Sequence, residues 1–150
     1  MHYFWIFSTA GHGWTKQEGW LSDNDVCEWE GVNNCIMMAG GSMVTELDLN
    51  SNNLVGRIPV ELTHVRSLGK KTIQFFSLFF AMCTSNVTFR PNTETLDLTD
   101  NELYGPIPPE FGYFEDMEVL RLGGNLLTGN IPPELAHLVN LQELYLHVNE

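Results

Sequence analysis

A short pattern of leucines and polar residues recurs along the chain. It reads L-x-L-x-x-N-x-L-x-G-x-I-P, with complete copies that begin at Leu47, Leu96 and Leu120 and an incomplete copy that begins at Leu144. The last three copies start 24 residues apart. Self-similarity at a fixed period of this size predicts a solenoid in which each copy forms one coil of the stack.

Each repeated position has a physical reason. The two leucines of L-x-L lie on one face of a short strand, and the residues beside them lie on the other face. Such strands are expected to stack in parallel, one per coil, above a continuous core. An asparagine follows where the chain leaves the strand, and its carboxamide both donates and accepts hydrogen bonds to backbone groups. This structural role is expected of Asn52, Asn101, Asn125 and Asn149.

The 24-residue period and the G-x-I-P ending resemble the plant-type leucine-rich repeat. The resemblance covers residues 44–68 and 94–150. It implies an α/β-type solenoid, a right-handed superhelix with a concave parallel sheet. Short 3-10 or helical segments are then expected on the convex side, and a helical, disulfide-bonded cap at the N-terminus.

The segment before the repeats is similar to the N-terminal cap of that family. The run C-E-W-E-G-V-N-N-C from Cys27 to Cys35 matches the cap core C-x-W-x-G-V-x-C, with one additional residue before the second cysteine. The resemblance implies a Cys27–Cys35 disulfide, worth roughly 2.5 kcal/mol in the chain-entropy model, and an oxidising compartment. Two free cysteines are the alternative. Trp14, Trp20 and Trp29 are expected to pack the cap onto the first coil.

These patterns divide the chain into a cap over residues 1–43 and repeats over residues 44–150. The repeats are expected at 44–68, 94–116, 117–140 and, truncated, 141–150. Residues 69–93 are either an insertion or a degenerate repeat. The insertion is preferred because a repeat would place Phe76 and Phe80 where asparagine and glycine are needed; a retained in-frame intron is one origin. The segment also carries an odd cysteine, Cys83, and a glycosylation sequon at Asn86.

Charge and motifs narrow the function classes. The 19 acidic and 7 basic residues give a formal net charge of −12, which disfavours nucleic acid and anionic membrane surfaces as partners. No secretory signal and no apolar run of about 20 residues, the length of a membrane span, is visible. No catalytic motif and no metal-ligand cluster stands out, so neither enzymatic activity nor a cofactor or metal is expected.

The positions between and beside the strand leucines are free of core packing and are expected to project from the concave face. One column of these positions carries Asp48, Asp97, Arg121 and Tyr145. Arginine and tyrosine are favoured contact residues at interfaces. The predicted binding residues are Asp48, Asn50, Asp97, Thr99, Arg121, Tyr145 and His147.

The resemblance implies recognition of a protein, peptide or glycan ligand by the extracellular or cell-surface part of a receptor-like protein. A secreted inhibitor of a cell-wall-degrading hydrolase and a fragment without independent function are the alternatives. The pattern stops within its fourth copy, at Asn149 and Glu150. An uncovered last coil, poor stability and self-association are therefore expected, and any membrane attachment is expected from a segment outside the 150 residues.

Overall fold

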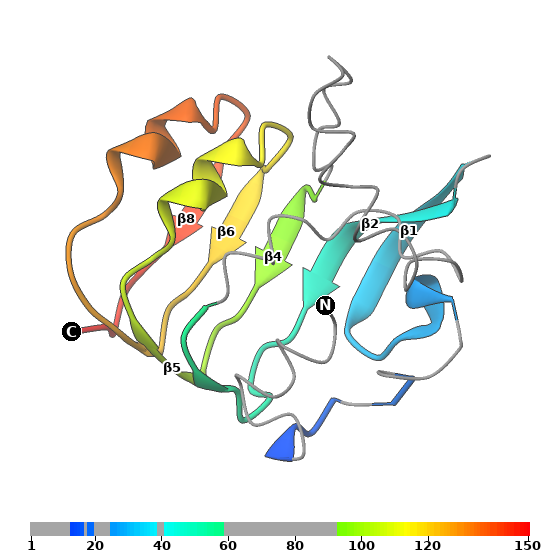
Figure 1. Ribbon diagram of the computed structural model, residues 1–150, viewed down its shortest axis with the longest axis horizontal. Coiled ribbons are helices and arrows are strands. Elements are labelled where there is room, and N and C mark those ends of the chain that lie inside the picture. Colours follow the sequence, from blue (N-terminus) through cyan, green and yellow to red (C-terminus); the bar gives the residue numbers. More distant parts are fainter. Residues whose placement is uncertain (1–12, 17, 20–24, 39–40, 59–92) are drawn as a thin grey trace, which may run out of the picture.

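The structure is a computed structural model that describes residues 13–16, 18–19, 25–38, 41–58 and 93–150. Its centre is a sheet of five strands that lie side by side (Figure 1), in the order β1-β2-β4-β6-β8. The strands are β1 (Val32–Met38), β2 (Gly41–Asp48), β4 (Thr95–Asp97), β6 (Val119–Arg121) and β8 (Glu143–Tyr145). Some of the predictions above fall outside the described residues. These concern Trp20 and residues 69–92, including Cys83 and Asn86.

Strands β2, β4, β6 and β8 run parallel, which confirms the expected stack of one strand per coil. The leucine that opens each copy of the pattern faces its counterpart, so Leu47 pairs with Leu96 and Leu120 pairs with Leu144. At one edge of this parallel sheet, the cap strand β1 is added and pairs with β2 antiparallel. Only residues 39–40 connect these two strands, and so short a connection joins antiparallel neighbours.

The rest of each coil returns along the flank and the convex side. A second, parallel sheet has the order β3-β5-β7, formed by β3 (Val55–Gly56), β5 (Glu102–Gly105) and β7 (Leu126–Leu127). Two 3-10 segments, η4 (Pro109–Tyr113) and η5 (Pro133–His137), pack against each other at one end of the coils (Figure 1). Each begins directly after the Ile-Pro of the pattern, because proline presets the backbone for the turn and lacks the N–H that a helix start leaves unpaired.

The leucines of the pattern form the core between the two sheets and the 3-10 segments. The strand leucines Leu96, Leu98, Leu120 and Leu122 are at most 1% exposed. The last coil differs, since Leu144 is 41% exposed. A leucine at this position is thus buried when a neighbouring strand lies on both sides of it, from a coil or from the cap.

Strands β2 and β4 are neighbours although 49 residues separate Leu47 from Leu96. Their adjacency is reinforced beyond the sheet, where the Leu49 N–H donates to Asp97 O at 2.8 Å and the Glu102 N–H donates to Leu54 O at 2.9 Å. The predicted insertion or degenerate repeat falls on residues outside the described ones and stays a prediction.

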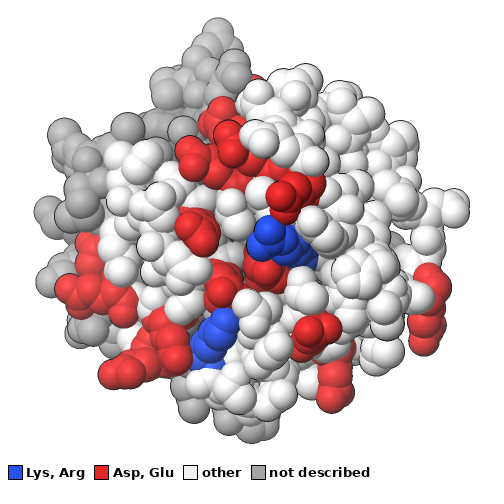
Figure 2. All heavy atoms as spheres, turned by 180° about the vertical axis from the view of Figure 1, so that it is seen from behind, with Lys and Arg blue, Asp and Glu red and all other residues white. Residues whose placement is uncertain are grey.

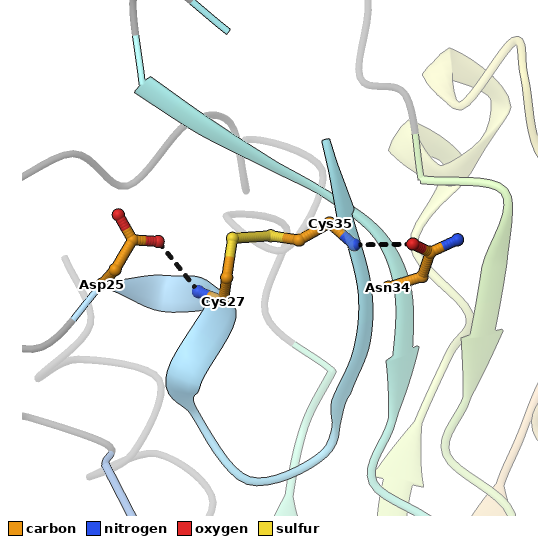
Figure 3. Close-up of a disulfide and its surroundings, with 4 residues drawn as sticks. All are labelled: Asp25, Cys27, Asn34 and Cys35. Carbon is orange, nitrogen blue, oxygen red and sulfur yellow. Dashed lines mark hydrogen bonds between the residues drawn. A yellow bond between two sulfur atoms is a disulfide. The ribbon is translucent and has the colours of Figure 1, made fainter. Parts of the chain in front are cut away.

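The cap is held by the expected disulfide between Cys27, in the 3-10 turn η2 (Val26–Glu28), and Cys35 in β1 (Figure 3). The sheet register shifts on both sides of Asn34, which is how the additional residue before Cys35 is absorbed. Figure 3 also shows the Asn34 side-chain oxygen accepting the Cys35 N–H at 2.9 Å. Trp14 and Trp29 are both buried and belong to the hydrophobic core cluster.

Candidate ligand-binding face

The candidate site lies on the outer face of the five-stranded sheet, which is turned away from the core and is called the concave face below. Its shape depends on the turns that follow each strand, and buried asparagines hold those turns. Asn101 Oδ1 accepts the N–H groups of Asn52 at 3.0 Å and Leu54 at 2.9 Å. Its Nδ2 donates, at 3.0 Å each, to the carbonyl oxygens of Leu49, Leu98 and Thr99.

The same bonds recur along the stack. Asn125 Oδ1 accepts the Leu103 N–H and Asn149 Oδ1 accepts the Leu127 N–H, both at 3.0 Å. At the cap end, Thr15 Oγ1 donates to Asn52 Oδ1 at 2.9 Å. These asparagines join each coil to the one before it, so that the strand exits keep a common geometry along the face.

Strand pairing places one column of predicted binding residues in register on the concave face. Asp48 pairs with Asp97, Asp97 with Arg121, and Arg121 with Tyr145. Neighbouring strands lie about 4.8 Å apart, so consecutive members of the column are within contact distance of each other.

Arg121 is held between two carboxylates from the neighbouring strands. Its guanidinium lies 2.9 Å from Glu143 Oε2 and 3.5 Å from Asp97 Oδ2. The hydrogen bond to Glu143, together with the charges of Asp97 and Glu143, raises the pKa of Arg121 and outweighs the opposing effect of burial. The guanidinium also lies over the Tyr145 ring, 5.5 Å from its centroid. Arg121 is therefore positioned and neutralised within the sheet.

Asp48 makes a second ion pair, which joins the cap to the first coil. Lys16 Nζ donates to Asp48 Oδ1 at 3.0 Å, and the same oxygen accepts the Asn50 N–H at 3.0 Å. Burial alone would raise the pKa of Asp48, but these hydrogen bonds and the charge of Lys16 lower it below its ordinary value. Sequence reasoning missed this partner, because nothing in the repeat pattern places Lys16 beside the first strand.

A shallow hollow of about 390 Å³ lies at the carboxyl ends of the strands. It brings together six of the seven predicted binding residues, while Asp48 lies outside its lining. The lining residues are Asn50, Asp97, Thr99, Asp100, Arg121, Tyr145 and His147. Asp100 was not among the predicted residues. The one signal for it in the sequence is the glycine at the corresponding position of the next coil, Gly124, which leaves room beside it.

Two consecutive glycines make this part of the face different from the other coils. A Cβ added at Gly124 would lie 2.1 Å from Asp100 Oδ1, and one at Gly123 would lie 3.0 Å from His147 Cε1. The side chains of Asp100 and His147, from the preceding and the following coil, therefore lie against the backbone of Gly124 and Gly123. Gly124 also has a φ of +64°, a left-handed conformation that glycine adopts without steric cost.

Acidic side chains dominate the surface. The described residues include 17 Asp and Glu but only Lys16, Arg57 and Arg121 as basic residues. Figure 2 shows that the basic groups visible on the face opposite to the view of Figure 1 are bordered by acidic ones. Lys16 and Arg121 both have carboxylate partners within 3.5 Å, so neither offers an unpaired positive charge to a ligand.

In the part of the chain that the structure describes, no three His, Cys, Asp or Glu side chains are grouped so that they could hold a metal ion. No helix there has the length and apolarity needed to cross a membrane.

Comparisons with known proteins agree with this architecture. A family model described as Leucine Rich Repeat matches residues 43–65, 92–114 and 116–138. A search of curated protein sequences found no significant match. Among solved structures, the BIR3–SERK2 complex from Arabidopsis thaliana is similar with a TM-score of 0.62 and 26% identity, covering 93% of this chain and 59% of that one.

Two further Arabidopsis thaliana structures are similar. The ectodomain of the plant membrane receptor kinase GASSHO1/SCHENGEN3, in complex with CASPARIAN STRIP INTEGRITY FACTOR 2, gives a TM-score of 0.58 at 29% identity, covering 91% of this chain and 16% of that one. The ectodomain of the receptor kinase SOBIR1 shares the fold, with a TM-score of 0.60 at 23% identity and coverage of 83% and 58%. The chain thus spans less than two thirds of the length of each of these structures.

The repeat period, the stacked parallel strands, the asparagine hydrogen bonds and these similarities lead to one family. This chain is a plant-type leucine-rich repeat protein, similar in fold to the ectodomains of plant receptor kinases.

Proposed function

We propose that this chain recognises a polypeptide ligand outside the cell through its concave face, as part of a receptor-like protein. The observation that carries the proposal is the hollow of about 390 Å³, where residues from four successive coils converge without taking part in the core. Extended concave surfaces are the parts of solenoids that serve binding. The lining includes an arginine and a tyrosine, which are frequent anchors of interfaces.

The similar structures support a polypeptide as the ligand. One is a complex of BIR3 with SERK2, and another is a receptor kinase bound to CASPARIAN STRIP INTEGRITY FACTOR 2. The disulfide between Cys27 and Cys35 supports an extracellular location, because such bonds persist in oxidising compartments. Binding rather than catalysis fits the arrangement, since Arg121 and its carboxylates are paired with one another and lie on an open surface.

Selection of ligands from a random library of 12-residue peptides tests the proposal. The full chain, secreted with its disulfide, is the target, and each selected peptide is then titrated against variants. Tyr145→Ala removes an exposed ring from the hollow, whereas Tyr113→Ala removes an exposed ring from η4 on the convex side. We expect Tyr145→Ala to weaken binding of the selected peptides at least tenfold and Tyr113→Ala to leave it unchanged. Peptides that bind both variants equally, or an absence of binders, would contradict the proposal.

A glycan is the other ligand class that the sequence analysis raised. The same two variants distinguish a glycan from a polypeptide ligand when a panel of cell-wall oligosaccharides replaces the peptide library. Oligosaccharide binding that Tyr145→Ala abolishes, without any peptide binder on this face, would overturn the choice of a polypeptide.

A further inference from the structure

We propose that the hollow lined by Asp100, Tyr145 and His147 is a subsite for one basic side chain of the ligand, which pairs with the carboxylate of Asp100. This inference rests on the recognition role proposed above and adds the chemistry of the group that is selected.

The unpaired charge belongs to Asp100. Asp97 and Glu143 both contact Arg121, at 3.5 Å and 2.9 Å, so these three groups form a mutually satisfied set. Asp97 Oδ1 also accepts the Thr99 N–H at 2.9 Å. Asp100 is an exposed residue, and among the residues described no Lys or Arg side chain pairs with it. A ligand cation would therefore meet a carboxylate without displacing an existing partner.

Gly124 makes room for this carboxylate, which stays exposed and lines the hollow. Asp100 Oδ1 occupies the space where a side chain at position 124 would lie, directly against the backbone of the third coil. The corresponding positions of the first and last coils carry Ser51 and Val148, both with positive φ as at Gly124. Among the four coils, only the third combines this backbone conformation with an absence of side chains, so the Asp100 carboxylate can lie against its backbone at one side of the hollow.

Across the hollow from Asp100, two aromatic rings form a wall that suits a planar cation. The rings of Tyr145 and His147 lie edge to face, with centroids 6.1 Å apart and an interplanar angle of 72°. An aromatic wall stabilises a guanidinium or ammonium through cation–π attraction, as Arg121 already shows on Tyr145. With Asp100 unpaired and the set around Arg121 carrying one excess negative charge, the hollow attracts cations and repels anions.

A titration followed by nuclear magnetic resonance tests the subsite directly. The isotope-labelled full chain is titrated with three blocked tripeptides that differ only in the central residue: N-acetyl-Gly-Arg-Gly-amide, its neutral citrulline analogue and its glutamate analogue. We expect the arginine peptide to shift the amide signals of Asp100, Gly123, Gly124 and His147. Citrulline keeps the shape of arginine without its charge, so its affinity should be at least tenfold weaker, and the glutamate peptide should produce no shifts.

Asp100→Asn identifies the residue responsible. This variant keeps the size of the side chain. It should weaken binding of the arginine peptide at least tenfold and leave the weak binding of the citrulline peptide unchanged. Asp116→Asn, in the convex turn between η4 and β6, is the matched control and should have no effect. Equal affinities for arginine and citrulline, or full arginine affinity in Asp100→Asn, would overturn the subsite.

The two proposals fail in different ways. Library peptides that bind the concave face without enrichment of arginine or lysine, with no shifts from the arginine peptide, would remove the subsite and keep the recognition role. Arginine-dependent shifts at the hollow, with no library peptide affected by Tyr145→Ala, would keep the subsite and remove the role of the face in polypeptide recognition.

Discussion

The side-chain oxygen of Asn101 accepts the backbone N–H of Leu54 at 2.9 Å, although 47 residues separate the two along the chain. Asn101 is 8% exposed and Leu54 is fully buried, so neither group has ready access to water. This bond joins the first coil to the coil that carries β4, across the long connection between them. A residue that the repeat pattern marks as a local turn former is therefore also a link between distant segments.

Replacing Asn101 by alanine should destabilise the protein strongly. The change leaves the buried N–H groups of Asn52 and Leu54 and the carbonyl oxygen of Leu49 without their side-chain partner, whereas the carbonyl oxygens of Leu98 and Thr99 keep other donors. Each unsatisfied buried group costs about 1–3 kcal/mol, so we expect a loss of at least about 3 kcal/mol in the free energy of unfolding, measured by urea denaturation. Asn140→Ala removes one bond from an exposed residue, to Glu115 O at 2.9 Å. Its effect should stay below about 1 kcal/mol; similar losses for both variants would refute this account.

Gly112 in η4 should tolerate no side chain. A Cβ there would lie 2.4 Å from Glu134 O in η5, and a backbone atom of the next coil cannot move aside without opening the stack. Overpacking of this kind costs about 1–3 kcal/mol, which we expect as the effect of Gly112→Ala in thermal or urea unfolding. Gly13→Ala is the control, since a Cβ at Gly13 meets no atom within 4 Å. A stable Gly112→Ala variant would show that the coils are not packed closely at this point.

The ion pair between Lys16 and Asp48 should give the cap a dependence on pH. The pKa of Asp48 is lower in the folded protein than its ordinary value of 3.8, so its ionised form stabilises the fold above that pH. The contribution is lost as the pH falls through the lowered pKa. We expect Asp48→Asn to cost about 1 kcal/mol or less at neutral pH and nothing in strong acid, measured by urea unfolding across this range. In a Lys16→Met background the difference should shrink; an unchanged difference would exclude Lys16 as its main cause.

Deletion of residues 69–93 should preserve the fold. The pairing of Leu47 with Leu96 does not need a strand from the connection, and a shorter connection loses less conformational entropy on folding. We expect cooperative urea unfolding with a midpoint no lower than that of the full chain. The matched control deletes residues 94–117, a coil that includes the buried Leu96, Leu98 and Leu103, and should lower stability by several kcal/mol. Loss of cooperative unfolding in the first variant would contradict the insertion.

The repeat architecture was predictable because local sequence patterns determine it. The alternation of Leu96 and Leu98 predicts a strand with one buried face, and both side chains are 1% exposed. The period of 24 residues then determines which residues of successive strands face each other, so that Leu96 meets Leu120. The cap disulfide followed from a motif shared with a known family, and its additional residue is absorbed by a local shift of register.

The composition of the concave face was predictable for the same reason, since strand register alone places Asp97, Arg121 and Tyr145 in one column. Contacts between coils were not predictable, because they depend on side-chain rotamers and on segments outside the repeat. Lys16 reaches Asp48 from the cap, and Asp100 bends over Gly124 of the next coil. The antiparallel edge strand β1 likewise depends on its short connection to β2.

The sequence by itself determined the coil, its core leucines, its asparagine turns and the residues that face outwards, because each is set by a period of 2 or of 24 residues. Only the tertiary structure decided which outward residues neutralise each other and which remain available. That distinction arises from close contacts between side chains of different coils, such as the 2.9 Å between the Arg121 guanidinium and Glu143 Oε2. Stacking creates these distances, and no single repeat contains them.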